Sequence, residues 1–222
     1  MSNRRMDGAS EIVTRKRVVD HGEVFTDRRE IRAMTANVAD IGHIETRVLE
    51  PACGNGNFLH EILKQKLQLV AKLFKKNLYE YQQHLIAAVA SIYGIDLLPD
   101  NVIACRARLL ALCEEEYQRT TKKSIPVLHR AVIEHLLIKN IIRGDALTMK
   151  HVGRSKKSIV FSEWTFVRGG KVKRRDFELA NLMSQGGKDG TKHISDMHEF
   201  QTIPLPVFTY PLRHFLDLIV DA

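Results

Sequence analysis

Three acidic residues each follow a short apolar stretch of the sequence. Glu50 follows "RVL", Asp96 follows "IYGI" and Asp145 follows "IIRG". Carboxylates accept hydrogen bonds from hydroxyl and amino groups, and the carboxyl ends of parallel strands form an edge at which ligands bind. We therefore expect the three carboxylates to face one ligand that offers a diol and amines. The alternative is that each acid is a helix cap or a solvated loop residue.

A glycine-rich turn follows the first of these acids. The stretch "VLEPACGNGNFLHEIL" places Gly54 and Gly56 between an apolar run and a helical pattern, and Pro51 fixes φ at the start of the turn. Such a turn lets backbone N–H groups approach a ligand. Leu59 stands where the dinucleotide fingerprint needs a third glycine, and no Walker lysine-serine pair follows, so NAD and ATP are disfavoured. An ordinary strand-turn-helix with incidental glycines remains the alternative.

The elements that carry these acids repeat along the chain. Helical periodicity extends over residues 58–90, with a break near Asn77, and begins again at Pro99. Apolar stretches predict four strands, at 46–52, 91–95, 140–143 and in "KSIVFSEWTFV", which ends at or passes through Glu163. Strands that alternate with helices predict a mostly parallel, doubly wound α/β sheet.

Composition limits the class of protein. With 222 residues, 44% of them hydrophobic, the chain can form one α/β domain with a sizeable core, or one domain with an extension. A net charge of +8 favours polyanionic partners, although 26 acidic residues make the surface mixed. The three cysteines and ten histidines show no metal-ligand spacing, so we expect no metal. No stretch resembles a signal peptide or a membrane span, so we expect a cytoplasmic protein without membrane contact.

Several motifs together resemble one family. The stretches "LEPACGNGNFL", "YGIDLLPDNV" and "IRGDAL" resemble motifs I, II and III of the gamma-class S-adenosylmethionine-dependent adenine-N6 DNA methyltransferases of bacterial restriction-modification systems. "HGEVFTDRREI" resembles motif X, which precedes motif I in this class. The resemblance covers roughly residues 17 to 150. It implies a Rossmann-like methyltransferase fold, S-adenosyl-L-methionine as cofactor and methyl transfer to adenine in DNA.

The resemblance also implies roles for individual residues. Glu50 and the turn after it would hold the methionine part of the cofactor, Asp96 would accept hydrogen bonds from the ribose hydroxyls, and Asp145 would meet the adenine amino group. Matched position by position, the implied cofactor-binding residues are Phe25, Thr26, Glu50, Ala52, Gly54, Gly56, Phe58, Asp96, Leu97, Asp145 and Ala146.

The sequence departs from the family at its fourth motif. In the family, [DNS]-P-P-[YFW] supplies acceptors for the target amine and an aromatic ring that stacks on the flipped base. This sequence has no Pro-Pro pair, and "FSEWTF" stands at the expected place. Glu163 and Trp164 are therefore the candidates for catalysis. The alternative is a core tryptophan beside a solvated glutamate.

A basic, glycine-rich stretch, "VRGGKVKRRDFELANLMSQGGKDGTKH", follows this place. Its candidate nucleic-acid contacts are Lys171, Lys173, Arg174 and Arg175, and the alternative is a mobile insertion. We expect four segments: a basic N-terminal arm at 1–20, a methyltransferase-like cofactor-binding domain at 21–168, a basic glycine-rich loop or insertion at 169–198, and a C-terminal packing segment at 199–222. The apolar residues that the last segment offers for packing are Phe208, Leu212, Phe215, Leu216 and Ile219.

Three hypotheses for function follow. The first is a site-specific DNA adenine-N6 methyltransferase, with RNA or protein acceptors left open. The second is a cofactor-binding subunit that needs another chain for target recognition and catalysis, because the residues after Asp145 are too few for the rest of a full sheet and a recognition domain. The third is an inactive relative that binds nucleic acid. Cofactor binding without methylation would separate the last two from the first.

Overall fold

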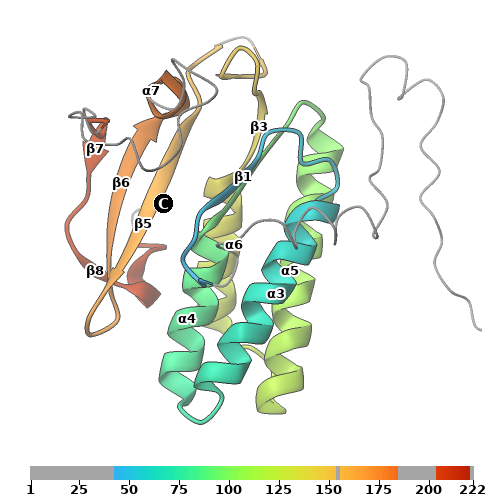
Figure 1. Cartoon of the computed structure of the whole chain (residues 1–222), viewed down its shortest axis with the longest axis vertical. Helices are drawn as coiled ribbons and strands as arrows, with labels where there is room; N and C mark the ends of the chain where they lie inside the picture. Colours follow the sequence, from blue (N-terminus) through green and yellow to red (C-terminus); the bar gives the residue numbers. More distant parts are fainter. Residues whose placement is uncertain (1–42, 154–155, 185–203, 221–222) are drawn as a thin grey trace, which may run out of the picture.

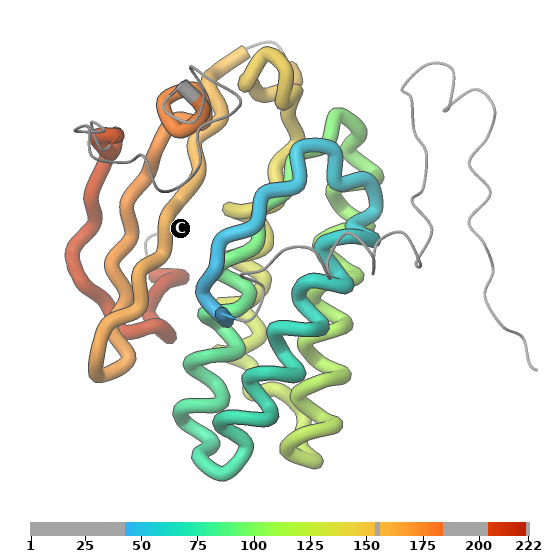
Figure 2. Tube along the Cα trace, viewed as in Figure 1, coloured from blue at the N-terminus to red at the C-terminus, as the bar shows by residue number. Residues whose placement is uncertain are grey.

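The computed structural model describes residues 43–153, 156–184 and 204–220, which form a mixed α/β arrangement of two sheets and a layer of helices (Figures 1 and 2). The elements of the first sheet and its helices are β1 (Val48–Glu50), α3 (Asn57–Phe74), α4 (Leu78–Ala90), β2 (Ile92–Asp96), α5 (Pro99–Thr121), α6 (Val127–Asn140), β3 (Ile141–Asp145) and β4 (Lys150–His151). Those of the second half are β5 (Val160–Val167), β6 (Lys171–Glu178), α7 (Leu179–Ser184), β7 (Phe208–Thr209), β8 (Arg213–His214) and the 3-10 helix η2 (Phe215–Asp217).

The first sheet has the strand order β1-β2-β3-β4, in which the first three strands are parallel and β4 is antiparallel. The mostly parallel sheet expected from the sequence is therefore confirmed. Helices α3 to α6 lie together on one side of it (Figure 1). Both crossovers step in the same direction, and right-handed crossovers that do so place their helices on one face. The reversal of strand order that defines a doubly wound sheet is absent from the described ranges.

Local sequence explains which face of a helix is buried and where the helices begin. The apolar residues Leu59, Ile62, Leu63, Leu67 and Val70 lie on one face of α3 and are buried. Helix α4 begins after the expected break, where the Asn77 side chain accepts a hydrogen bond from the Glu80 N–H. Helix α5 has Pro99 in its first turn.

The second sheet is built on a hairpin of β5 and β6. Eight residue pairs join the two strands, from Val160 opposite Glu178 to Val167 opposite Lys171. Gly169 and Gly170 form the turn with φ of 76° and 68°. The expectation of a basic loop or insertion from residue 169 is wrong for residues 171–184, which form β6 and α7. The expected domain boundary after residue 168 falls in the hairpin turn, because the glycine pair reverses the chain instead of opening a loop.

The hairpin uses its two faces differently. Trp164 and Val172 belong to the core that the four helices form, together with Phe215 of η2. On the opposite face, Phe161 packs with Tyr93 and neighbouring residues of the first sheet. The expected C-terminal packing segment therefore packs through Phe215, which is fully buried, whereas Phe208 and Leu212 are exposed.

Candidate functional site

The strand order brings the three acids to one edge of the sheet. Glu50, Asp96 and Asp145 are the last residues of β1, β2 and β3, which are adjacent and parallel. The sequence predicts this placement, and the structure has it. The chemistry of the edge then depends on how much hydrogen-bonding capacity each carboxylate has left.

Asp96 joins the turn after β1 to the end of β2. Its Oδ2 accepts from the Gly54 N–H at 2.9 Å, and its Oδ1 accepts from the Leu98 N–H at 2.8 Å and from Asn101 Nδ2 at 3.2 Å. A carboxylate has about four acceptor positions, so about one is left for a ligand hydroxyl. Leu97 lies half exposed beside it.

Asp145 accepts most of its hydrogen bonds from the turn that follows it. Its Oδ1 accepts from the Leu147 N–H at 2.9 Å and from the Thr148 N–H at 3.4 Å, and its Oδ2 accepts from Thr148 Oγ1 at 2.9 Å. The Thr148 hydrogen bond is the main cause that lowers the pKa of Asp145 below its ordinary value. The neighbouring Ala146 packs on the hairpin side of the sheet. Asp145 thus acts as a turn cap in this structure, and about one of its acceptor positions is left for a ligand.

Glu50 has the largest capacity left. Among the described residues, its carboxylate receives one long hydrogen bond, from the Ala52 N–H at 3.4 Å. Burial raises the pKa of Glu50 above its ordinary value. A half-buried carboxylate with few donors is stabilised by a cationic or N–H-bearing ligand group.

The turn itself needs glycine at two positions for two different reasons. Gly54 has φ of 52°, and a Cβ there would meet no atom within 4 Å, so the space above it is open. Gly56 has φ of 87°, and a Cβ there would lie 2.6 Å from Cys105 Sγ of α5. Cys53 anchors the turn from beneath, because its N–H donates to the Ile95 carbonyl at 2.9 Å and its side chain is buried.

Gly56→Ala is expected to lower the free energy of unfolding by about 2–4 kcal/mol, from left-handed strain together with overpacking against Cys105. Gly54→Ala is the matched control, because it meets the same strain in open space and is expected to cost only about 1–2 kcal/mol. Urea unfolding of both variants measures the difference. Equal losses would contradict the packing of the turn against α5.

Other residues that the resemblance implies are placed less favourably or lie outside the described residues. The Phe58 ring packs against the helix-side core, and Ala52 is exposed beside Glu50. Phe25 and Thr26, like the basic N-terminal arm, lie outside the described residues.

The structure does not bring Glu163 and Trp164 together. The two are neighbours on β5, so their side chains point to opposite faces of the hairpin. Trp164 is buried and donates from Nε1 to Asn140 Oδ1 at 3.1 Å. Glu163 pairs with Arg47 at 2.7 Å and with Arg175 at 2.5 Å. The tryptophan is therefore a core residue and is not placed to stack on a base, and the glutamate is ion-paired instead of solvated.

The four basic candidates on β6 also separate by strand alternation. Lys171 and Lys173 are exposed. Arg174 points to the other face, where its Nη2 donates to Asp176 Oδ2 at 2.8 Å and its guanidinium lies 4.1 Å from the Tyr210 ring centroid. Arg175 is held by Glu163. Of these four candidates, only the two lysines make no ion pair with a described residue.

Sequence reasoning missed Lys66, a fully buried lysine on α3. Its Nζ donates to the carbonyls of Ile44 and Thr46 and to Ser91 Oγ, and thereby ties α3 to the residues before β1 and β2. A signal was present, because Lys66 stands four residues after the buried Ile62 and four before the buried Val70.

Within the described ranges, no helix is both long and apolar enough to cross a membrane, and no cluster of three or more His, Cys, Asp or Glu side chains could hold a metal ion. Comparison of the chain with protein-family models, with curated proteins and with solved structures finds no match.

Proposed function

We propose that this chain binds S-adenosyl-L-methionine at the carboxyl edge of its parallel sheet and is a methyltransferase acting on adenine N6 in DNA, in a restriction-modification context. The observation that carries the proposal is the placement of three strand-end carboxylates at one edge of the parallel sheet, which also carries an open glycine turn. When bound, the cofactor would supply a methyl group activated by a sulfonium.

The donor and acceptor chemistry of this edge supports the proposal. Glu50 offers a carboxylate just before the turn that holds the open space above Gly54, and this suits the ammonium group of the cofactor's methionine end. Asp96 and Asp145 each have about one acceptor position left, and this suits hydroxyl and amino groups. The hydrogen bond from the Gly54 N–H to Asp96 fixes the glycine turn after β1 against the end of β2.

A second candidate function is a cofactor-binding subunit that depends on a partner for catalysis or target recognition. It is favoured by the burial of Trp164, because this ring packs in the core and is not placed to stack on a base as the aromatic residue of the fourth motif would. It is also favoured by the place of β1 at the edge of the sheet. In the described ranges β1 pairs only with β2, so its other side is open to a further strand. DNA is the partner in both cases, with Lys171 and Lys173 as the exposed contacts.

Asp96→Asn is expected to weaken S-adenosyl-L-methionine binding about tenfold or more, since the lost charge-assisted hydrogen bonds are each worth about 1.5–3 kcal/mol. Isothermal titration calorimetry of the full chain measures the affinity. Glu115→Gln is the control, because it removes an exposed carboxylate of α5 away from the strand ends and should bind like the original protein. Absence of heat with the original protein would reject the proposal.

Transfer of a tritiated methyl group to unmethylated DNA then separates the two functions. Incorporation by the chain alone supports the methyltransferase. After digestion of the DNA to nucleosides, the label should be found on N6-methyladenine. Cofactor binding without incorporation supports the partner-dependent subunit.

A further inference from the structure

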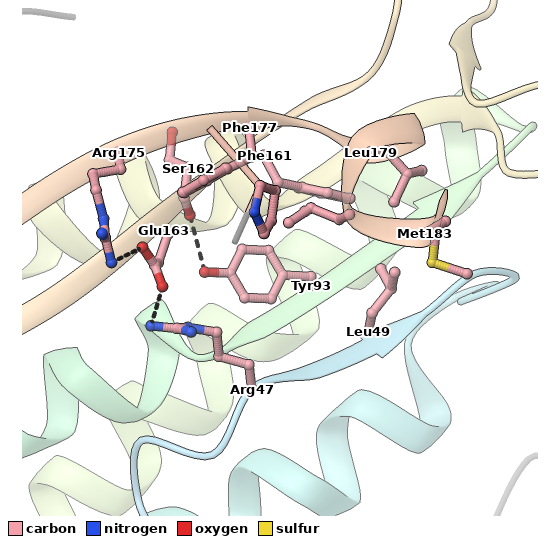
Figure 3. A pocket seen from close by; sticks show the side chains of 12 residues that line it. Arg47, Leu49, Tyr93, Phe161, Ser162, Glu163, Arg175, Phe177, Leu179 and Met183 are labelled. Carbon is pink, nitrogen blue, oxygen red and sulfur yellow. Dashed lines mark hydrogen bonds and ion pairs between the residues drawn. The ribbon is translucent and has the colours of Figure 1, made fainter. Parts of the chain in front are cut away.

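A pocket lies on the face of the parallel sheet that the helices do not cover (Figure 3). Its volume is about 380 Å³, and it is enclosed by β1, β2, the β5–β6 hairpin and α7. This size is within the range of small-molecule sites. Glu50, Asp96 and Asp145 do not line it, so it is separate from the carboxyl edge.

Most of the pocket wall is apolar and much of it is aromatic. The rings of Tyr93 and Phe161 meet edge to face, with centroids 5.2 Å apart, and Phe177 adds a third ring. The Tyr93 hydroxyl donates to the Ser162 carbonyl at 2.9 Å, so it is already satisfied and its ring is fixed. The remaining apolar lining is Leu49, Leu179, Leu182, Met183 and Pro204. Such walls favour a flat apolar body.

One end of the pocket carries charge. Glu163 lies between Arg47 and Arg175 and pairs with both, as Figure 3 shows. Two guanidinium groups against one carboxylate leave one positive charge at this end. Arg175 Nε is buried and makes no hydrogen bond to the described residues. An unmet donor beside an excess positive charge is stabilised by an anionic acceptor.

From these two ends we propose that the pocket binds a small monoanion with a flat apolar body, whose anionic group meets Arg175 and Arg47 and whose body lies between Tyr93, Phe161 and Phe177. Glu163 holds the two arginines in place and cancels one of their charges, so that a single anionic group balances the site. This inference does not depend on cofactor binding at the carboxyl edge.

A pair of fluorescent probes with related bodies tests the charge requirement. 1-Anilinonaphthalene-8-sulfonate has an aromatic body and a sulfonate, and N-phenyl-1-naphthylamine has the same body without the charge. Fluorescence titration of the full chain is expected to show one saturable site that binds the sulfonate about tenfold or more tightly than the neutral probe, the effect of one charge-assisted hydrogen bond. Equal affinities or unsaturable binding would overturn the proposal.

Variants locate the site. Arg175→Gln is expected to weaken sulfonate binding about tenfold and to leave the neutral probe unchanged. Lys173→Gln, on the same strand but outside the pocket lining, should change neither. Arg47→Gln, at a half-exposed position, provides the same test should Arg175→Gln not fold. Leu182→Trp should exclude both probes by filling the pocket, and unchanged binding in this variant would place the probes elsewhere.

Discussion

Trp164→Ala is expected to reduce the free energy of unfolding by about 3–5 kcal/mol, the usual cost of truncating a buried aromatic side chain. The ring is 5% exposed and meets His135 edge to face, with centroids 6.3 Å apart. Its Nε1 donates to Asn140 Oδ1, and the fully buried Asn140 in turn donates to the carbonyls of Ala90 and Ile92, at the end of α4 and the start of β2. Truncation therefore leaves a cavity and an unmet acceptor at the start of β3.

Urea unfolding followed by far-ultraviolet circular dichroism measures this loss, because Trp164 is the only tryptophan and fluorescence would vanish with it. Trp164→Phe keeps an aromatic ring but removes the N–H, so it is expected to cost about 1–3 kcal/mol, near the penalty of an unmet buried acceptor. Replacing a tryptophan that served only to stack on a base would lower the free energy of unfolding little. A loss below about 1 kcal/mol in Trp164→Ala would therefore contradict the core placement.

The carboxyl edge could be predicted from sequence because its information is local. An acid after a buried apolar run stands at a strand end, and strands joined by helices are parallel, so Glu50, Asp96 and Asp145 had to share an edge once their strands were adjacent. The bonds of each acid could not be predicted, since they depend on neighbours such as Gly54 and Thr148 whose N–H and hydroxyl directions are set by the turns.

The hairpin could not be read in the same way because its signal was masked by charge. Residues 171–176 are mostly basic and suggest a solvated loop, yet Val172, Arg174 and Asp176 alternate with Lys171, Lys173 and Arg175 at the period of a strand. The charge of Arg174 is paired with Asp176 on the same strand, and its guanidinium lies over the ring of Tyr210. The pocket follows from this packing of hairpin on sheet, so no single stretch of sequence encodes it.

The stability contributed by Lys66 is expected to depend on pH. Burial lowers its pKa from 10.5 to about 8, against a smaller opposing effect of Glu45. Between these two pH values the unfolded chain binds more protons than the folded chain. The contribution of Lys66 to the free energy of unfolding therefore rises with pH across this window and falls as the pH falls towards 8. From pH 7.5 to 9.5 this contribution should increase by about 2 kcal/mol, since one pKa unit corresponds to about 1.36 kcal/mol.

The original protein alone cannot display this slope, because other groups have raised pKa values. The pKa of Cys53 is raised mainly by its hydrogen bond with the Cys105 side chain, and the pKa values of Cys113 and Tyr81 are raised mainly by burial. Ionisation of these groups in the unfolded chain opposes folding at high pH. The difference in unfolding free energy between the original protein and Lys66→Met cancels those groups and isolates the lysine. Lys72→Met, at an exposed position of the same helix, should follow the original protein at every pH. A pH-independent difference for Lys66→Met would mean that the ammonium keeps its ordinary pKa. The Ile44 and Thr46 carbonyls would then compensate its burial in full.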